Sequence, residues 1–331
     1  MYVYINPCVT PSIPYYKIPS VHERIPPPMM MSGHGGAVIA DLAAIPSNLY
    51  KPNAPWEAEV LEVKCLTADH SDNDVKHVVL SLKGSQYRYL EGQSVGILPP
   101  GIDEKTGKAH KLRLYSIASP SVGDDGNGET VTVCVKRLVY QNESGETIQG
   151  VCSSFICDLE VGQKVMVTGP VGKAFLPPQH ANPNMIMVAT GTGIAPFRAF
   201  MHWRYVQHPQ QTGKTMLFFG VQKQADMLYE DELQAYATQN PGTCQVITAR
   251  SREEKTSEGN RMYVQHRIAE HANTVLDLLL EDNTYFYICG LRGMEPGIFE
   301  ALEQAAQAKG LSWESILVGL QQSGRWMVEV Y

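Results

Sequence analysis

The chain has 331 residues, a formal net charge of −7 and an isoelectric point near 5.8. This length suffices for about two domains, and the acidic balance argues against a general nucleic-acid-binding surface. The seven cysteines show no CxxC pair and no Cys/His zinc spacing, so they favour reduced thiols and exclude an iron–sulfur cluster held by clustered cysteines. No apolar run approaches the roughly 20 residues of a membrane-spanning helix, and we expect no integral membrane segment.

The first 50 residues differ from the rest of the chain. They hold seven prolines between Pro7 and Pro28 and a run of three methionines, with neither strand nor helix periodicity. This composition predicts a flexible, proline-rich leader over residues 1–50. A transit-peptide remnant is the alternative, but such peptides are rich in Arg and Ser, and this segment is not.

Residues 51–180 have the pattern of an antiparallel β-barrel. Strand-like runs at 60–63, 75–80 and 131–135 are separated by segments rich in Gly, Asp and Pro. The stretch 123–128 is a turn or a loop. Several short strands at this spacing favour a barrel.

Residues 181–331 change rhythm and alternate between strands and helices. This alternation predicts a doubly wound parallel sheet whose ligand crevice lies at the carboxyl ends of the strands. We expect strands at 185–189, 216–219, 244–248 and 285–289, helices at 196–206, 225–238, 263–280 and 295–309, and a final strand-like run ending in Tyr331.

Three segments after these strands carry groups suited to a dinucleotide. The Gly-rich turn 190–196 can hold a diphosphate at a helix N-terminus, although an ordinary tight turn is the alternative. Ser251, Arg252, Arg261 and Tyr263 suit a 2′-phosphate and an adenine, although interspersed glutamates also fit a solvated charged loop. Cys289 ends a strand where a nicotinamide can lie, but a buried cysteine is usually only a small hydrophobic residue.

The barrel region carries a second set of such groups. Strand alternation places Arg113 and Tyr115 on one face, where they suit a diphosphate and a flat ring. The same alternation places Lys136 with Thr132 and Cys134. We expect Ser153 to be the N-cap of a helix running from about residue 155. Taken singly, each feature is more typical of an ordinary strand or cap.

Taken together, these segments resemble plant-type ferredoxin–NADP reductases over residues 49–331. The resemblance rests on residues 112–119, 134–140, 150–153, 169–173, 190–196 and 287–295 and on the ending at Tyr331. It implies an FAD-binding β-barrel over residues 51–180 and an NADP-binding α/β domain over residues 181–331.

The resemblance also implies which residues bind each cofactor. FAD would be held by Arg113, Leu114, Tyr115, Ser116, Cys134, Val135, Lys136, Tyr140, Val151, Cys152 and Ser153. NADP(H) would be held by Thr192, Val221, Gln222, Ser251, Arg252, Arg261, Tyr263, Gly290 and Leu291, with Lys136 toward its phosphates. Ser116, Cys289, Glu329 and Tyr331 would be the catalytic group, around the place where hydride passes between flavin and nicotinamide. Tyr331 would stack on the flavin and move aside for the nicotinamide.

The implied reaction is electron transfer between two one-electron-reduced ferredoxins and NADP⁺, which makes the chain an oxidoreductase. Ferredoxin, or flavodoxin in its place, would dock on a basic patch near Lys111, Arg113 and Arg292, flanked by Lys309. The expected location is the plastid stroma or the thylakoid surface, where peripheral membrane association is compatible with the sequence.

The chain departs from the family's usual pattern at three places. Ala174-Phe175 replaces Glu-Met, and we expect this change to alter the partner surface. Val221-Gln222 replaces Val-Pro in an NADP loop, and the chain ends in Glu-Val-Tyr instead of Glu-Thr-Tyr.

Two other functions fit less well. One is a reductase module of a nitrate reductase or diflavin system, and the other is a non-catalytic redox sensor that keeps NADP binding.

Overall fold

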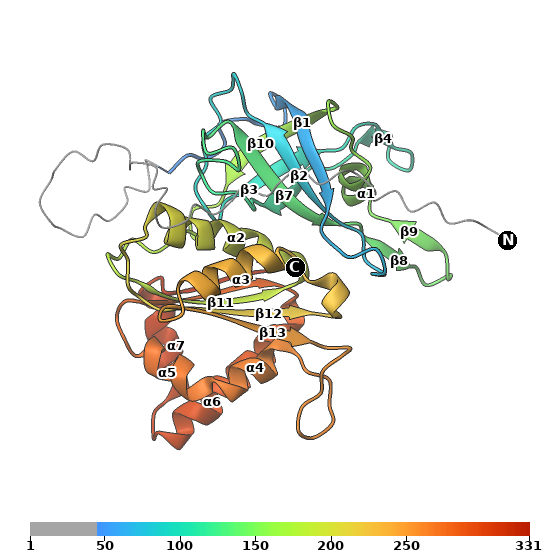
Figure 1. The fold of residues 1–331 in the computed structure, drawn as a ribbon. Helices are drawn as coiled ribbons and strands as arrows, with labels where there is room; N and C mark the ends of the chain where they lie inside the picture. The colour runs from blue at the N-terminus through green and yellow to red at the C-terminus, as the bar shows by residue number, and fades with distance from the viewer. Residues whose placement is uncertain (1–44) are drawn as a thin grey trace, which may run out of the picture.

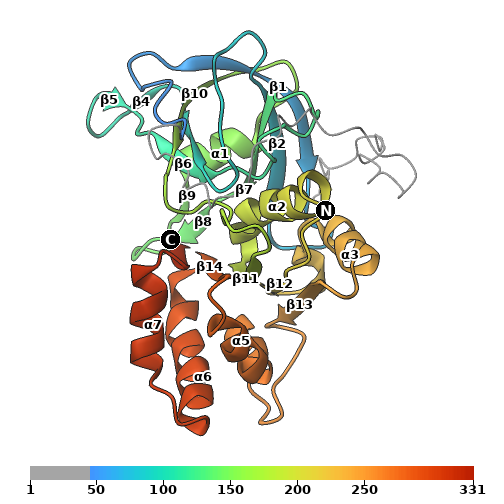
Figure 2. The same cartoon turned by 90° about the vertical axis from the view of Figure 1, so that its left-hand side faces the viewer.

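The computed structural model describes residues 45–331, which form a β-barrel stacked on an α/β layer (Figures 1 and 2). Most of the predicted leader lies outside the described residues. Asn48 and Tyr50 hydrogen-bond to the backbone of Pro170 and Gly169, so contacts with the barrel begin slightly before residue 51.

The upper layer is a six-stranded antiparallel sheet in the order β6-β3-β10-β1-β2-β7. An antiparallel bridge between Ile117, directly after β6, and Val133 of β7 joins the two edge strands and closes the barrel. The predicted barrel is therefore confirmed. Its strands are β1 (Trp56–Cys65), β2 (Val75–Ser81), β3 (Ser94–Leu98), β6 (Arg113–Ser116), β7 (Thr130–Lys136) and β10 (Lys164–Val171).

Small elements decorate the barrel. The hairpin of β4 (Ile102–Asp103) and β5 (Lys108–Ala109) precedes β6, and a second hairpin joins β8 (Val139–Gln141) to β9 (Thr147–Gln149). The short helix α1 (Val151–Cys157) follows at once.

The lower layer is a five-stranded parallel sheet in the order β13-β12-β11-β14-β15. Numbered along the chain, this order is 3-2-1-4-5, so the direction of winding reverses between β11 and β14. Ligand crevices of such sheets form at this reversal. The strands are β11 (Asn184–Thr190), β12 (Thr215–Val221), β13 (Cys244–Arg250), β14 (Thr284–Gly290) and β15 (Trp326–Val330).

Helices cover both faces of this sheet, as a doubly wound fold requires. In Figure 1, α2 (Ala195–His202) and α3 (Glu230–Gln239) lie between the sheet and the barrel. The opposite face carries α4 (Val264–Glu270), α5 (Ala272–Leu279), α6 (Glu295–Ala308) and α7 (Trp313–Gln322).

Four helices differ from the sequence prediction. The helix expected from residue 225 begins at Glu230, because residues 224–226 form a 3₁₀ turn and Tyr229 has a left-handed backbone (φ 56°). The helix expected over 263–280 is interrupted at His271 (φ −113°, ψ 9°) and forms α4 and α5. The last turn of the 196–206 helix is π-helical, and α7 was not predicted.

Side-chain alternation along β11 separates two cores. Ile186 and Val188 point into the core shared with α4–α7. Met185, Met187 and Ala189 point the other way, into a core that also contains residues of the barrel part, among them Val75, Ala118, Cys134 and Phe175. A third core fills the barrel and holds Val131, Val133 and Val135, which confirms the two faces predicted for that strand.

Phe175 corrects one expectation drawn from the departures. Its side chain is 2% exposed and packs against Phe197, Phe200 and Tyr287, with ring centres 5.9, 5.9 and 5.3 Å away. It therefore forms part of the core between barrel and sheet and not part of a partner surface. The neighbouring Ala174 is exposed.

Arg198 of α2 joins the two layers by polar contacts. Its Nη1 donates to Asp124 Oδ1 (2.8 Å) and to the carbonyl oxygen of Ala118 (3.1 Å), both on the barrel side. Its Nε donates to Glu232 of α3 (2.9 Å). Burial is the largest single effect and would raise the pKa of Asp124, but Arg198, His77 and the Thr132 hydroxyl together lower this pKa. The barrel and the sheet are thus held in one orientation by a charged cluster as well as by apolar packing.

Candidate functional site

The site is built around the reversal of the sheet, where the turn after β11 meets the end of β14. A Cβ atom on Gly193 would lie 2.2 Å from the carbonyl oxygen of Cys289. Gly290 has φ +130°, and a Cβ atom there would lie 2.4 Å from Thr190 Oγ1. Thr190 Oγ1 also accepts a hydrogen bond from the backbone N–H of Leu291 (2.8 Å). Only glycine fits at positions 193 and 290, and the two turns pack backbone to backbone.

The predicted catalytic residues Ser116, Cys289 and Glu329 converge on this place from both layers. Cys289 and Glu329 are paired in register on β14 and β15. The Ser116 side chain comes from barrel strand β6 and hydrogen-bonds to the thiol. The pKa of Cys289 is raised to about 12, first by burial and then by the Glu329 carboxylate, so it remains a thiol at neutral pH.

Glu329 is the group in this cluster that titrates near neutrality. Its side chain is partly buried, and burial raises its pKa to about 7. A carboxyl group with this pKa can gain or lose a proton at physiological pH. The sequence predicted a functional carboxyl group at position 329. The burial that raises its pKa comes from the packing of the folded protein.

Tyr331 lies beside the same turn. Its backbone N–H donates to Gly290 (3.0 Å), its carbonyl oxygen accepts from Arg292 (3.4 Å), and its hydroxyl hydrogen-bonds to Thr192 Oγ1 (2.8 Å). The side chain is nonetheless 64% exposed. In both views the chain end lies where the barrel meets the α/β layer (Figures 1 and 2).

On the barrel side, several of the predicted flavin residues are apolar and partly open to solvent. Tyr115 is partly buried next to Cys152, and burial raises the pKa of its phenol above the ordinary value. Leu114, Tyr140 and Val151 are about half exposed. The cations Arg113, at the start of β6, and Lys136, at the end of β7, are also exposed. Uncovered aromatic and aliphatic groups beside two cations fit a ligand with flat rings and a diphosphate, and FAD is such a ligand.

Ser153 does not have the position expected for it. The N-cap of α1 is Gly150, no side chain caps the helix, and Ser153 lies within its first turn. Its hydroxyl accepts from the N–H of Leu138 (3.1 Å) and donates to the carbonyl oxygen of Gly150 (3.1 Å). The prediction failed because the strand β9 leads directly into the helix, which starts two residues before Ser153. The remaining flavin candidates Cys134 and Val135 are buried in β7.

The candidate 2′-phosphate loop is assembled by backbone contacts between two strand ends. The N–H of Ser251 donates to Val221 (3.0 Å), and the N–H of Arg252 donates to Gln222 (2.8 Å). A bridge between Lys255 and Arg261 folds the following loop back, so that Arg261 returns toward β13. Gln222 accepts the hydrogen bond from Arg252 with its backbone carbonyl group, which a proline also has. The contact is therefore possible with either residue at this position.

The acidic neighbours in this loop are already engaged. Glu254 binds Arg250 (2.8 Å) and Arg267 (3.1 Å), and Glu253 accepts the N–H of Gln224 (2.9 Å). In residues 45–331, no carboxylate lies within 4.0 Å of the guanidinium group of Arg252 or Arg261. Both are exposed, as is Tyr263 at the N-cap of α4. The two guanidinium groups are therefore open to solvent, and their role in binding a 2′-phosphate stays a prediction.

Thr190 and Gly193 were recognised as members of the turn but received no role of their own. Their partners Leu291 and Cys289 lie about a hundred residues away in the chain. The only signal in the sequence was the clustering of small residues after a buried strand. The exposed Leu291 extends beyond this contact.

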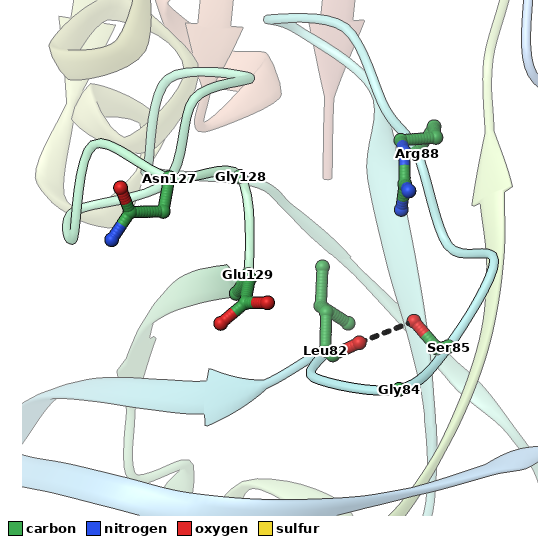
Figure 3. Close-up of a pocket in the computed structure, with 7 residues that line it drawn as sticks. All are labelled: Leu82, Gly84, Ser85, Arg88, Asn127, Gly128 and Glu129. Atoms are coloured by element: carbon green, nitrogen blue, oxygen red, sulfur yellow. Dashed lines mark hydrogen bonds between the residues drawn. The ribbon is translucent and has the colours of Figure 1, made fainter.

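The hollow drawn in Figure 3 lies elsewhere on the barrel, between the loop after β2 and the loop before β7. None of the predicted site residues borders it; it is lined by Leu82, Gly84, Ser85, Arg88, Asn127, Gly128 and Glu129.

Across residues 45–331 no cluster of His, Cys, Asp and Glu could hold a metal ion. Over the same residues, every helix is too short or too polar to cross a bilayer.

The predicted basic groups are exposed but do not all lie together. Lys111 and Arg113 precede and begin β6, and Arg292 follows β14 beside Tyr331. Lys309 follows the last turn of α6, a helix of 14 residues that begins at Glu295. At 1.5 Å per residue it lies about 20 Å from Arg292. Lys309 also pairs with Asp277.

Comparisons with known proteins agree with this geometry. The oxidoreductase NAD-binding domain family matches residues 187–299. The ferredoxin–NADP reductase of Thermosynechococcus vestitus is 49% identical over 293 residues, covering 87% of this chain and 75% of that protein. The chloroplastic leaf isozyme 1 of Arabidopsis thaliana is 44% identical over 288 residues, covering 86% and 79%.

A solved structure provides an independent comparison. The ferredoxin–NADP⁺ reductase of Plasmodium falciparum superposes with a TM-score of 0.68 at 28% identity, covering 86% of this chain and all of that one. Identity above 40% over most of both chains, together with the barrel and the 3-2-1-4-5 sheet, places the protein within one family. The chain belongs to the ferredoxin–NADP reductase family.

Proposed function

We propose that the protein transfers electrons between ferredoxin and NADP(H) with FAD as its resident cofactor. The observation that carries the proposal is the meeting of Ser116 from the barrel with Cys289 and Glu329 from the sheet, beside Tyr331. A ligand of the barrel and a ligand at the reversal of the sheet would meet at that point. Bound FAD would allow electrons to be exchanged singly with ferredoxin and in pairs with NADP(H).

The chain's own residues would position two nucleotides and manage one proton. Arg113 and the first turn of α1 would hold the FAD diphosphate, and Tyr115 would support its ring. Arg252 and Arg261 would bind the 2′-phosphate of NADP(H), because their guanidinium groups have no carboxylate within 4.0 Å among residues 45–331. Ser116 would fix the Cys289 thiol at the reacting face, and Glu329 would exchange a proton near neutral pH.

Ferredoxin is the proposed partner because the related reductases carry it in their names. Lys111, Arg113 and Arg292 are exposed on both sides of the site and would attract an acidic protein. The proposed location is a plastid, supported by the chloroplastic relatives. Import of a fluorescent fusion into plastids would support this location, and retention in the cytosol would contradict it.

Three measurements on the purified protein test the function. We expect a yellow flavoprotein that reduces ferricyanide much faster with NADPH than with NADH. We also expect cytochrome c reduction to depend on added ferredoxin. A colourless protein without affinity for added FAD contradicts the proposal. Ferricyanide activity without any ferredoxin dependence would instead identify a reductase module with another partner.

A further inference from the structure

The loop after β12 is held on two sides by other parts of the molecule. On one side it supports the candidate 2′-phosphate loop, because the carbonyl oxygen of Gln222 accepts the N–H of Arg252 (2.8 Å). On the other side it lies against the barrel loop between β1 and β2, where the N–H of Ala68 donates to the carbonyl oxygen of Ala225 (2.9 Å). The segment 222–226 therefore connects the candidate phosphate site with the barrel.

The carboxylate of Asp226 joins this segment to side chains of the barrel. Asp226 is 8% exposed. Its Oδ1 accepts hydrogen bonds from Ser71 Oγ (2.6 Å) and from Asn73 Nδ2 (2.7 Å), which both lie in the barrel loop. Its Oδ2 accepts the backbone N–H of Lys223 (3.0 Å). One carboxylate thus holds its own loop and two side chains of the barrel, through charge-assisted hydrogen bonds that are stronger than neutral ones.

The same barrel loop lies close to the arginine of the candidate site. Asp72, which stands between the two donors in the sequence, pairs with Lys223 at 2.7 Å. Lys223 is the larger cause of the lowered pKa of Asp72, and the Arg252 guanidinium is a smaller one. An ion pair this exposed contributes little to stability. Its geometry nevertheless brings the barrel loop beside the candidate phosphate site.

We propose that Asp226 is a positioning residue that fixes the candidate 2′-phosphate loop to the barrel and so presents Arg252 to NADP(H). This inference rests on the proposed function and adds a determinant of the choice between NADP(H) and NAD(H) that lies outside the phosphate site. The physical reason is preorganisation, because a loop that is held before the ligand arrives loses less conformational freedom on binding. NAD⁺ has no 2′-phosphate and gains nothing from the held arginine.

The two barrel donors allow a test that leaves every residue of the α/β domain unchanged. The FAD-loaded double variant Ser71→Ala/Asn73→Ala removes both of the barrel's hydrogen bonds to Asp226. We expect NADP⁺ and adenosine 2′-monophosphate to bind about 3- to 10-fold more weakly, and NAD⁺ to bind as in the wild type. Titration calorimetry measures the three affinities without turnover. Equal losses for NADP⁺ and NAD⁺, or no loss for either, would overturn the proposal.

Two further variants separate positioning from a general loosening of the barrel. Ser85 also lies in a barrel loop, but its hydroxyl donates within the barrel, to the carbonyl oxygen of Leu82 (2.6 Å). Ser85→Ala should therefore leave the ratio of NADP⁺ to NAD⁺ affinity unchanged. Ser71→Thr keeps a hydroxyl donor for Asp226 and should bind NADP⁺ like the wild type. A changed ratio in Ser85→Ala as large as that in the double variant would overturn the proposal.

A mutant cycle tests whether the contact acts through Arg252. In the Arg252→Ala background, removal of the two barrel donors should lower NADP⁺ affinity by less than about 2-fold, because no guanidinium group is left to be positioned. The full 3- to 10-fold loss in this background would overturn the proposal. Failure of the wild type to bind NADP⁺ would overturn the proposed function as well, whereas normal binding by both the wild type and the double variant would overturn this inference alone.

Discussion

Cys289 and Glu329 lie side by side on the adjacent parallel strands β14 and β15. The carboxyl group of Glu329 contributes to the raised pKa of the thiol, while burial raises its own pKa to about 7. This pair places a carboxyl group that titrates near neutral pH at one side of the sheet, beside a buried thiol. The pKa values of both groups depend on how deeply they are buried.

The first prediction concerns the pH dependence of stability. The pKa of Glu329 rises from 4.5 in the unfolded chain to about 7 in the folded protein, so the native state binds the proton more tightly. Its contribution is neutral below pH 4.5, and stability is lost as the pH rises through 7. At ~1.4 kcal/mol per pH unit between pH 4.5 and about 7, the loss is at most about 3.5 kcal/mol.

The variant Glu329→Gln removes this titration. We expect the variant and the wild type to differ little at pH 4.5 and the variant to be the more stable at pH 8. Thermal unfolding of both proteins at the two pH values measures the difference. Parallel pH profiles for the two proteins would show that Glu329 titrates normally.

The second prediction concerns the charged cluster between the layers. Arg198→Met leaves Asp124 and Glu232 without their guanidinium partner in a poorly hydrated place. Removing one partner of such a buried pair costs about 3–5 kcal/mol. Urea unfolding should show this loss. The matched control is Lys164→Met, which breaks a pair with Glu59 whose side chains are about half exposed, and it should cost less than about 1 kcal/mol. Equal effects of the two variants would contradict a structural role for the cluster.

The third prediction concerns the choice between NADP(H) and NAD(H). Arg252→Ala and Arg261→Ala each remove a charged donor that has no carboxylate within 4.0 Å in residues 45–331. Charge-assisted hydrogen bonds contribute about 1.5–3 kcal/mol, so each variant should lose roughly 10- to 150-fold in NADP⁺ affinity. NAD⁺ affinity should stay constant, because NAD⁺ has no 2′-phosphate. A parallel loss for both ligands would place these arginines outside a 2′-phosphate site.

The fourth prediction concerns docking of the partner. The ferredoxin-dependent rate should fall steeply between low and physiological salt, because association relies on attraction between charged surfaces. Lys111→Gln should lower the rate at low salt and flatten its salt dependence. Lys309→Gln removes the same charge about 20 Å from Arg292 and should leave the rate unchanged. If both variants behave alike, net charge and not a local patch governs the encounter.

Several features of the site followed from local patterns. The buried strand before the turn 190–196 is marked by a run of apolar residues, and the small residues that follow it predict a tight backbone. The arginines after β13 and the alternation in β7 were recognised in the same way. Such signals depend on residues within a few positions of one another. Helix starts were less certain, because α1 begins two residues before Ser153, Tyr229 has a left-handed backbone, and His271 divides the expected long helix.

The sequence by itself determined the barrel followed by the alternation of strands and helices, and the chemical types of the residues at the strand ends, because periodicity and turn chemistry act over short distances. Tertiary structure alone decided that Ile117 closes the barrel on Val133, that Phe175 is buried between the layers, and that Tyr331 reaches Thr192. These contacts join residues far apart in the chain. Their formation depends on the burial of apolar surface shared by both layers, and that burial also sets the pKa of Glu329.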